Sequence, residues 1–328
     1  MSQALKPFKQ MHFSAVPDAP RLPHPYFRAE QRQVRVRTSH FGTVKMHVSV
    51  YGEGPPLLLL HGLMTASYSF RYVMDALAKH YTLYIPDLLG GGRSDKPDTS
   101  YGPDDLARSV GELLKELGIW GTPAIGNSMG GYLLMRLALL EPAAISRLVN
   151  LHSPGLPTAR MHALSLVSAI PSAFEAAVGT LVRLNPERWV HTNVHYYDET
   201  LKSREEHREY AGALTSPNGV LGLARHLSDT LSVREMRRFE AALKGLEHFP
   251  VPLLLVYAKQ DKMVPPIVGE RLAKRIPDAR IKWLEQASHF AHVDAPEAFL
   301  EVAMPFLATV LSNKLLLNEK AQSITNSC

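Results

Sequence analysis

The sequence of 328 residues predicts an α/β protein built on a mostly parallel sheet flanked by helices. Short apolar runs that suit buried strands alternate with segments whose apolar residues recur at helical spacing. Between residues 153 and 249 this alternation stops, and helical patterns continue without a convincing buried strand. We therefore expect one sizeable core with a helical insertion, in agreement with a hydrophobic content of 45%.

The predicted strands fall along the chain in a regular order. Residues 34–37 and 44–51 suggest an opening antiparallel pair. The later apolar runs are short and continuous, as expected for strands that are buried on both faces of a parallel sheet. These runs are 57–61, 82–86, 122–126, 145–151, 252–258 and 280–284.

Helical patterns separate the strands. A first helix is predicted over about 68–79. A second, over 103–117, carries an apolar stripe at helical spacing, and Gly118 follows as its stop. A third, over 129–140, ends before Pro142, which cannot continue a helix. The apolar stripes are expected to pack against the sheet.

A Gly-x-Ser-x-Gly sequence with Ser128 at its centre joins the strand 122–126 to the helix 129–140. This pattern is typical of a nucleophile elbow, a sharp turn that exposes a serine hydroxyl above the sheet. Gly126 and Gly130 are needed because a β-carbon at either position would meet the neighbouring strand or helix. An ordinary glycine-rich turn would match the same five residues, so the wider context has to decide.

A catalytic serine needs a general base and a carboxylate that orients the base. Asp261 lies on the loop after the strand 252–258, and His289 lies a few residues past the strand 280–284. The chain order is therefore Ser128, Asp261, His289. This order is the one found in the α/β-hydrolase fold and in neither of the two other well-known serine hydrolase folds.

From about residue 34 to 311 the chain resembles the α/β-hydrolase superfamily, which includes esterases, lipases, perhydrolases, C–C bond hydrolases and dehalogenases. Besides the elbow and the Asp and His positions, the sequence Leu-Leu-Leu-Leu-His-Gly at 57–62 and the loop 87–95 carry the resemblance. It implies an α/β-hydrolase fold with a mostly parallel eight-stranded sheet and a helical cap inserted after strand 6. The triad implied is Ser128, Asp261 and His289.

The same resemblance implies an oxyanion hole made of two backbone N–H groups. These belong to Met129, which follows the nucleophile and opens a helix, and to Leu63, which follows the His-Gly pair. His61 and Gly62 are supporting residues, and His61 is expected to orient its loop by hydrogen bonding rather than to act as a second base. Gly126 and Gly130 support the elbow.

Several other polar residues compete for these roles. His292 lies three residues past His289 and is expected to pack near the following helix. Asp87 ends a strand near the site and, with Asp95, is expected to shape a loop. Asn150 lies near the end of the strand 145–151, where some relatives carry the triad acid, but an amide cannot serve as that acid.

A capping box is the expected role of the carboxylates after His292. Asp294 would accept a backbone N–H at the start of a helix running to about residue 310, with Pro296 in the first turn and Glu297 three residues after the cap.

The boundaries implied along the chain are an N-terminal extension at 1–33, a core at 34–152 and 250–312, a cap at 153–249 and a tail at 313–328.

Within the cap, residues 156–184 are rich in apolar side chains and are expected to form a roof over Ser128. The segment 204–210 is heavily charged and is expected to face water. Residues 1–33 drape over the body, contact a partner or stay disordered, and the sequence leaves these alternatives open.

The reaction implied is acyl transfer through a covalent intermediate on Ser128, which favours a carboxylesterase acting on a small, largely apolar substrate. C–C bond hydrolysis of ring-fission products is the alternative, although 63–67 (Leu-Met-Thr-Ala-Ser) departs from the glycine-rich continuation usual in those enzymes. Dehalogenases and epoxide hydrolases use an aspartate nucleophile, so Ser128 argues against both. A ligand receptor built on a hydrolase fold is a third hypothesis, but a purely binding role gives no reason for a strained serine.

Composition limits the partners. The net charge of +5 is spread along the chain without a basic run, so we expect a small-molecule substrate and no nucleic acid. Metal-binding motifs and paired cysteines are missing, and the single cysteine is Cys328, so no cofactor is predicted. No leader or membrane-spanning run is recognised, which favours a cytoplasmic location. The oligomeric state is left open.

Overall fold

The computed structural model describes residues 7–159, 161–163 and 171–308. The strands are β1 Glu30–Thr38, β2 Gly42–Tyr51, β3 Pro56–Leu60, β4 Thr82–Pro86, β5 Thr122–Asn127, β6 Ile145–Leu151, β7 Leu253–Ala258 and β8 Arg280–Leu284. They form one sheet in the order β1-β2-β4-β3-β5-β6-β7-β8. β2 pairs antiparallel with β1 and β4, and every other neighbouring pair is parallel. The predicted α/β-hydrolase sheet of eight strands is thus confirmed.

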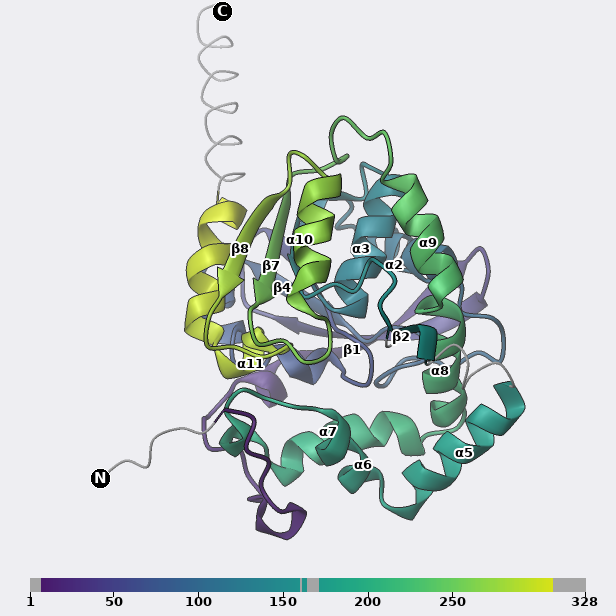
Figure 1. Cartoon of the computed structure of the whole chain (residues 1–328), viewed down its shortest axis with the longest axis vertical. Helices are drawn as coiled ribbons and strands as arrows, with labels where there is room; N and C mark the ends of the chain where they lie inside the picture. Colours follow the sequence, from purple (N-terminus) through teal and green to yellow (C-terminus); the bar gives the residue numbers. More distant parts are fainter. Residues whose placement is uncertain (1–6, 160, 164–170, 309–328) are drawn as a thin grey trace, which may run out of the picture.

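Helices cover both faces of the sheet (Figure 1). The helices are α1 Met74–Ala78, α2 Pro103–Glu116, α3 Met129–Leu140, α5 Pro171–Leu184, α6 Pro186–Asn193, α7 Arg204–Thr215, α8 Gly219–Arg225, α9 Val233–Ala242, α10 Pro266–Arg275 and α11 Ala291–Asp294. A further helical stretch covers residues 296–308. Short 3-10 turns lie at Phe13–Ala15, Tyr26–Arg28, Ser67–Phe70 and Glu199–Leu201, and a π-helical turn lies at His226–Thr230.

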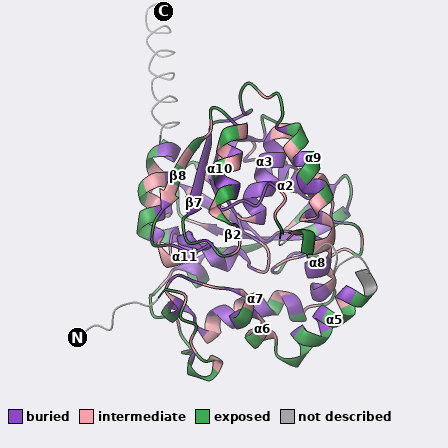
Figure 2. Ribbon diagram, viewed as in Figure 1, coloured by how far each residue is buried: buried purple, intermediate pink, exposed green. Residues whose placement is uncertain are grey.

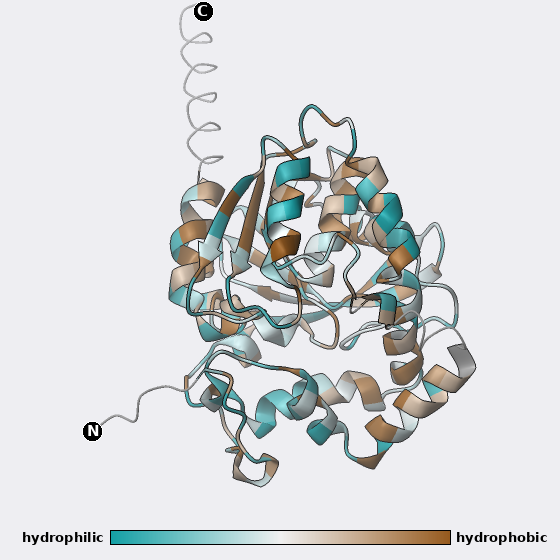
Figure 3. Ribbon diagram, in the orientation of Figure 1, coloured by the Kyte–Doolittle hydropathy of each residue, from teal (hydrophilic) through white to brown (hydrophobic). Residues whose placement is uncertain are grey.

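The alternation of side chains along β3 explains why its sequence is continuously apolar. Leu57 and Leu59 join the core on one face of the sheet, while Leu58 and Leu60 join the core on the other. All four side chains are fully buried. The inner strand β7 is buried along its whole length as well, and it is drawn as buried in Figure 2 and as mostly hydrophobic in Figure 3. A strand that is covered on both faces has no position for a polar side chain, so the pattern is an unbroken run.

Two predicted elements differ from the structure at their ends. β1 begins at Glu30, because its edge-strand backbone pairs with β2 over nine residues, including the polar ones. The predicted helix over 68–79 is divided into the 3-10 turn Ser67–Phe70 and the short helix α1. Asp87 accepts a hydrogen bond from the Ser67 backbone N–H at 2.7 Å, and this tertiary contact holds the turn.

Helices α5 to α9 lie between β6 and β7 in sequence, and α5, α6 and α7 form a layer beyond the carboxyl ends of the parallel strands (Figure 1). The expectation that 204–210 faces water is wrong for one side of α7. Glu206, His207 and Tyr210 are buried, and Glu206 pairs with the fully buried Arg71. Polar residues of α7 are buried because the helix is covered on a second face as well.

That second face of α7 is covered by the N-terminal extension. The Arg204 backbone N–H donates to the carbonyl of Pro17 at 2.8 Å, and the Arg204 guanidinium lies 3.7 Å from the centre of the Phe13 ring. Among the alternatives for residues 1–33, the described part from residue 7 therefore drapes over the body. No helix in the described part of the chain is long and apolar enough to cross a bilayer.

Candidate active site

Ser128 occupies the sharp turn between β5 and α3. Its φ of +53° and ψ of −120° are strained for a residue with a side chain. A β-carbon on Gly126 would lie 2.6 Å from the Gly131 Cα, and one on Gly130 would clash with the Leu60 and His61 carbonyl oxygens, much closer than any normal contact. Only glycine fits at these two positions, for the steric reason that the sequence suggested.

Asp261 and His289 are brought together from two separate loops. His289 Nδ1 lies 2.7 Å from Asp261 Oδ2, and both side chains are buried. The other carboxylate oxygen of Asp261 accepts the backbone N–H groups of Met263 and Val264 at 2.7 and 2.9 Å. Burial alone would raise the pKa of Asp261, but the charge and hydrogen bond of His289 outweigh it and hold the pKa below its usual value. The carboxylate is therefore ionised at neutral pH and must be the acceptor, which puts a proton on His289 Nδ1.

Ser128 and His289 line the same cavity, which has a volume of about 130 Å³. The remaining described lining is mostly apolar: Leu63, Met64, Pro154, Thr158, Met161, Asn193, Val194, Leu227, Leu231, Met263, Val264 and Phe290. No hydrogen bond joins Ser128 to His289 among the described residues. In hydrolases this contact often tightens only when substrate binds.

The expected roof over Ser128 is only partly accounted for. Residues 160 and 164–170 lie outside the described part of the chain. No residue of α5 with a described side chain lines the cavity. The described cover comes instead from the segment after β6, from the end of α6 and from the region of the π-helical turn.

The loop after β3 lies directly against the elbow. A β-carbon on Gly62 would lie 3.0 Å from the Ser128 β-carbon, so the loop backbone passes close to the serine. Leu63 follows at the cavity wall, and Met129 is buried at the start of α3. Their backbone N–H groups are the two candidates for an oxyanion hole.

His61 is fully engaged beneath that loop. Its Nδ1 lies 2.7 Å from the Gly62 carbonyl oxygen, and its Nε2 accepts the Leu88 backbone N–H at 2.9 Å. The Thr65 hydroxyl donates to the same Gly62 oxygen at 3.1 Å. Burial lowers the pKa of His61, so the ring is neutral and bridges the loops after β3 and β4.

The loop after β4 is organised around the buried carboxylate of Asp87. Asp87 accepts the backbone N–H groups of Ser67 and Arg93, and His47 Nδ1 lies 3.0 Å from its Oδ2. Burial would raise the pKa of Asp87, but these partners lower it well below its usual value. Asp95 accepts the Lys45 backbone N–H at 2.7 Å. Neither carboxylate lines the cavity among the described residues, which agrees with loop shaping.

The predicted capping box at Asp294 is wrong. Asp294 lies inside the short helix α11, and its carboxylate accepts the backbone N–H groups of Tyr197 and Ser288. Tertiary partners have displaced the local cap, because the chain from α6 to α7 passes close to the loop that carries His289. His292, also on α11, is buried against the Phe70 ring and does not line the cavity.

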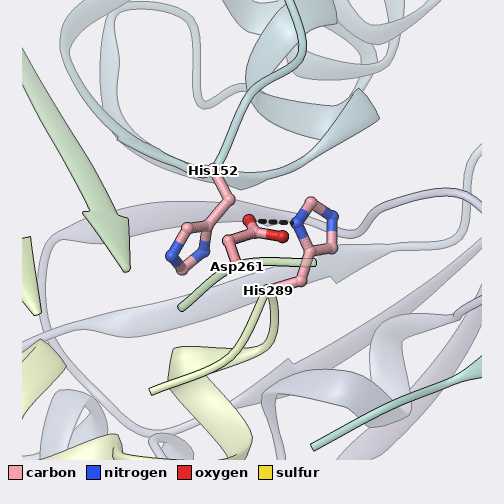
Figure 4. Close-up of side chains that lie close together, drawn as sticks. All are labelled: His152, Asp261 and His289. Atoms are coloured by element: carbon pink, nitrogen blue, oxygen red, sulfur yellow. Dashed lines mark hydrogen bonds and ion pairs between the residues drawn. The ribbon is translucent and has the colours of Figure 1, made fainter. Parts of the chain in front are cut away.

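Two side chains close to the pair escaped the sequence analysis. Asn127, next to the nucleophile position, reaches the backbone of His289. His152 directly follows β6 and lies beside Asp261 and His289 (Figure 4). At this end of the strand, His152 and not Asn150 is therefore the residue next to the pair. The signal that could have found His152 is its place at the carboxyl end of a parallel strand.

His152, Asp261 and His289 are also the one group in the described residues whose side chains could together approach a metal ion. The 2.7 Å contact between Asp261 and His289 already satisfies the carboxylate and the imidazole. The geometry is that of a hydrogen-bonded pair, and the prediction that no metal is needed stays a prediction.

Eight strands in this order, with a glycine-flanked serine directly after β5, define the α/β-hydrolase class. The chain belongs to the alpha/beta hydrolase fold family, whose model matches residues 55–296.

Individual relatives are distant but cover most of the chain. A candidate carbamate hydrolase, RutD, from Azorhizobium caulinodans is 25% identical over 278 residues, 83% of this chain and 98% of that protein. A 2-hydroxy-6-oxo-6-(2'-aminophenyl)hexa-2,4-dienoic acid hydrolase from Metapseudomonas resinovorans is 26% identical over 271 residues, 81% of this chain and 89% of that protein. The structure of the epoxide hydrolase CorEH without ligand matches with a TM-score of 0.72 and 24% identity, covering 86% of this chain and all of that one. The last likeness concerns the fold alone.

Proposed function

We propose that the chain is a serine hydrolase that cleaves a carboxylic ester, or a related acyl bond, of a small and largely apolar substrate. The observation that carries the proposal is that Ser128 and His289 open into one mostly apolar cavity while His289 is hydrogen-bonded to an ionised Asp261. The family consists of hydrolases. One relative is named as a candidate carbamate hydrolase, and a carbamate, like an ester, contains an acyl bond.

In this mechanism Ser128 attacks the carbonyl carbon of the substrate. Because the Nδ1 proton of His289 is donated to Asp261, Nε2 is the nitrogen that takes the serine proton. His289 then protonates the leaving alcohol, and a water molecule activated by the same Nε2 hydrolyses the acyl-enzyme. The backbone N–H groups of Leu63 and Met129 hold the oxyanion in both tetrahedral intermediates.

Cavity size bounds the acyl group. The volume of about 130 Å³ is close to that of an engineered protein cavity of roughly 150 Å³ that holds benzene. An acyl chain or ring of roughly six carbon atoms would therefore fill it. Asn193 and Thr158 are polar residues in its lining and would face a polar atom of the substrate.

We also assign residues 153–249 as a cap over this cavity. The assignment is supported by Asn193, Val194, Leu227 and Leu231, which belong to this segment and line the cavity together with the core residues. A cap that excludes water would strengthen the electrostatic contacts at the acyl carbon.

The test is the hydrolysis of a series of p-nitrophenyl esters of increasing acyl length by the wild type, by Ser128→Ala and by a control, Ser109→Ala. Ser109 is a buried serine on α2, away from the cavity. We expect turnover to be greatest for short acyl groups, to vanish in Ser128→Ala and to persist in Ser109→Ala. A fluorophosphonate should label the wild type once, at Ser128, as read by peptide mass. Equal turnover by the wild type and Ser128→Ala would refute the proposal.

C–C bond hydrolysis is a second candidate, because a relative carries the name of a dienoic acid hydrolase. A dienoic acid brings a carboxylate, and the described lining of the cavity contains no Lys or Arg to meet it. This observation ranks the ester first. Incubation with a 2-hydroxy-6-oxo-dienoic acid, followed by the loss of its visible absorbance, decides between the two: turnover of the acid at a higher kcat/KM than any ester would reverse the order.

A further inference from the structure

His152 is a buried residue in a strained backbone conformation directly after β6. Its φ is +57°, in the left-handed region that favours glycine, and its side chain is fully buried. A residue other than glycine is uncommon in this conformation, although histidine adopts it more often than most, and the conformation persists when the surroundings hold it. At this position the contacts of the imidazole and of the His152 backbone hold the conformation.

The hydrogen bonds of His152 fix its tautomer. Its backbone N–H donates to the Val256 carbonyl at 2.9 Å, which extends the β6–β7 ladder by one step. Its Nε2 accepts the Ala258 backbone N–H at 2.8 Å. A neutral imidazole with one accepting nitrogen carries its proton on the other, so Nδ1 is the donor. This Nδ1 makes no hydrogen bond of normal geometry among the described residues, although a weaker contact with the His289 backbone favours a proton on the ring.

The surroundings of the ring are the Asp261–His289 pair. One side-chain nitrogen or oxygen from each of His152, Asp261 and His289 lies within 4.8 Å of the other two. The centres of the two imidazole rings are 5.5 Å apart, and the Asp261 carboxylate lies between the rings (Figure 4). Burial lowers the pKa of His152 to about 3, so the ring is neutral at physiological pH.

We propose that His152 is a positioning residue for catalysis, whose Nδ1–H dipole holds the Asp261 carboxylate in the place and charge state from which it orients His289. This inference rests on the proposed roles of Asp261 and His289. A neutral donor is suited to the task, because it favours the carboxylate without adding a positive charge that would disfavour the imidazolium form of His289.

The alternative is that His152 only completes the sheet. Without the His152 ring, the Ala258 backbone N–H at the end of β7 would lack an acceptor. Ala258 in turn accepts the Asp261 backbone N–H through its carbonyl oxygen, at the start of the turn that carries Asp261. The two nitrogens of His152 thus separate the two roles. Nε2 serves the fold, and Nδ1 serves the reacting pair.

Two substitutions test the roles of the two ring nitrogens separately. His152→Gln places an oxygen acceptor where Nε2 lies and removes the donor at Nδ1. His152→Asn places an amide donor where Nδ1 lies, tolerates the left-handed backbone and removes the acceptor for Ala258. The melting temperature of both variants is measured, and kcat and KM are measured with the preferred ester. Because His152 does not line the cavity, the substitutions should not change KM through direct contact with the substrate.

We expect the Gln variant to keep the melting temperature and KM of the wild type while kcat falls about tenfold or more, as for a small misplacement of a catalytic group. The Asn variant should melt at a lower temperature but retain kcat within about threefold at a temperature where it is folded. If the Gln variant has the kcat of the wild type, His152 is a purely structural residue and the inference is wrong.

A second measurement does not depend on turnover. The Nδ1 proton of His289, hydrogen-bonded to Asp261, should give a downfield proton resonance that is assigned by its loss in Asp261→Ala. It should shift or broaden in His152→Gln and persist in His152→Asn, and an unchanged resonance in the Gln variant overturns the inference. If Ser128→Ala keeps its turnover while this resonance responds as expected, the proposed function fails but the positioning of the pair by His152 stands.

Discussion

Asn127 donates through its Nδ2 to the backbone carbonyl oxygen of His289 at 3.1 Å, so the residue before the nucleophile holds the backbone of the base. The same amide group lies 3.4 Å from the carbonyl oxygen of Leu151 at the end of β6. Asn127 is fully buried. It therefore ties together the ends of β5 and β6 and the loop that follows β8, which are the three places where the site is assembled.

Asn127→Ala should lower kcat for ester hydrolysis about tenfold and leave KM nearly unchanged. The substitution frees the His289 backbone, and a small displacement of the base is costly, but Asn127 does not line the cavity. Steady-state kinetics with one short ester measures both constants. A rise in KM with an unchanged kcat would mean that Asn127 acts on the cavity and not on His289.

Gly126→Ala should destabilise the protein by at least about 3 kcal/mol, as a severe case of overpacking. The new β-carbon would lie 2.6 Å from two backbone atoms of Gly131, which cannot move aside without breaking the elbow. Gly212→Ala is the matched control, because Gly212 is an exposed position on α7 with nothing within 4 Å of a β-carbon. Its effect should be neutral or stabilising by up to about 1 kcal/mol. Urea unfolding measures both, and similar midpoints for the two variants would contradict the steric argument.

Much of the fold could be predicted because its signals are local. The apolar run of β3 reports burial on both faces, and the glycines around Ser128 report a turn that no β-carbon can enter. Strand ends mark the edge where Ser128, Asp261 and His289 gather, so their approximate positions also followed from the sequence.

Contacts between distant segments could not be predicted in the same way. Asp294 has the sequence of a helix cap, but its carboxylate binds the Tyr197 backbone, which lies almost a hundred residues earlier. The charges of α7 suggest a solvated face, but Glu206 is buried and pairs with Arg71, which lies 135 residues earlier in the chain. Local pattern gives no information on which buried partner a polar side chain will find.

Arg71→Met should destabilise the protein by about 3–5 kcal/mol, because it leaves Glu206 buried without its partner. Arg71 Nη2 lies 2.5 Å from Glu206 Oε2, which also accepts the Tyr196 hydroxyl at 2.7 Å. The double variant Arg71→Met/Glu206→Leu should regain most of the loss, since it removes both charges from the interior. Urea unfolding of the two single variants and the double variant gives the coupling energy, and purely additive losses would show that the ion pair is not the dominant contact.

The stability of the protein should depend on pH through Asp294. Burial raises the pKa of this carboxyl to about 6, although backbone N–H groups of Tyr197 and Ser288 favour its ionised form. The usual value for an unfolded Asp is about 3.9. Between these two values the folded state binds more protons than the unfolded state, so this group makes stability fall as pH rises from about 4 to about 6.

Asp294→Asn removes that titration and keeps one oxygen to accept both N–H groups, so it tests the sign directly. The free energy of unfolding of the variant minus that of the wild type should increase between pH 4 and pH 7 by up to about 3 kcal/mol, the equivalent of the shift in pKa. Urea unfolding at both pH values measures this difference, and other titrating groups cancel because they are common to both proteins. A difference that decreases with pH would mean that the carboxylate is stabilised in its ionised form, with the two N–H groups outweighing burial at the junction between the His289 loop and the segment from α6 to α7.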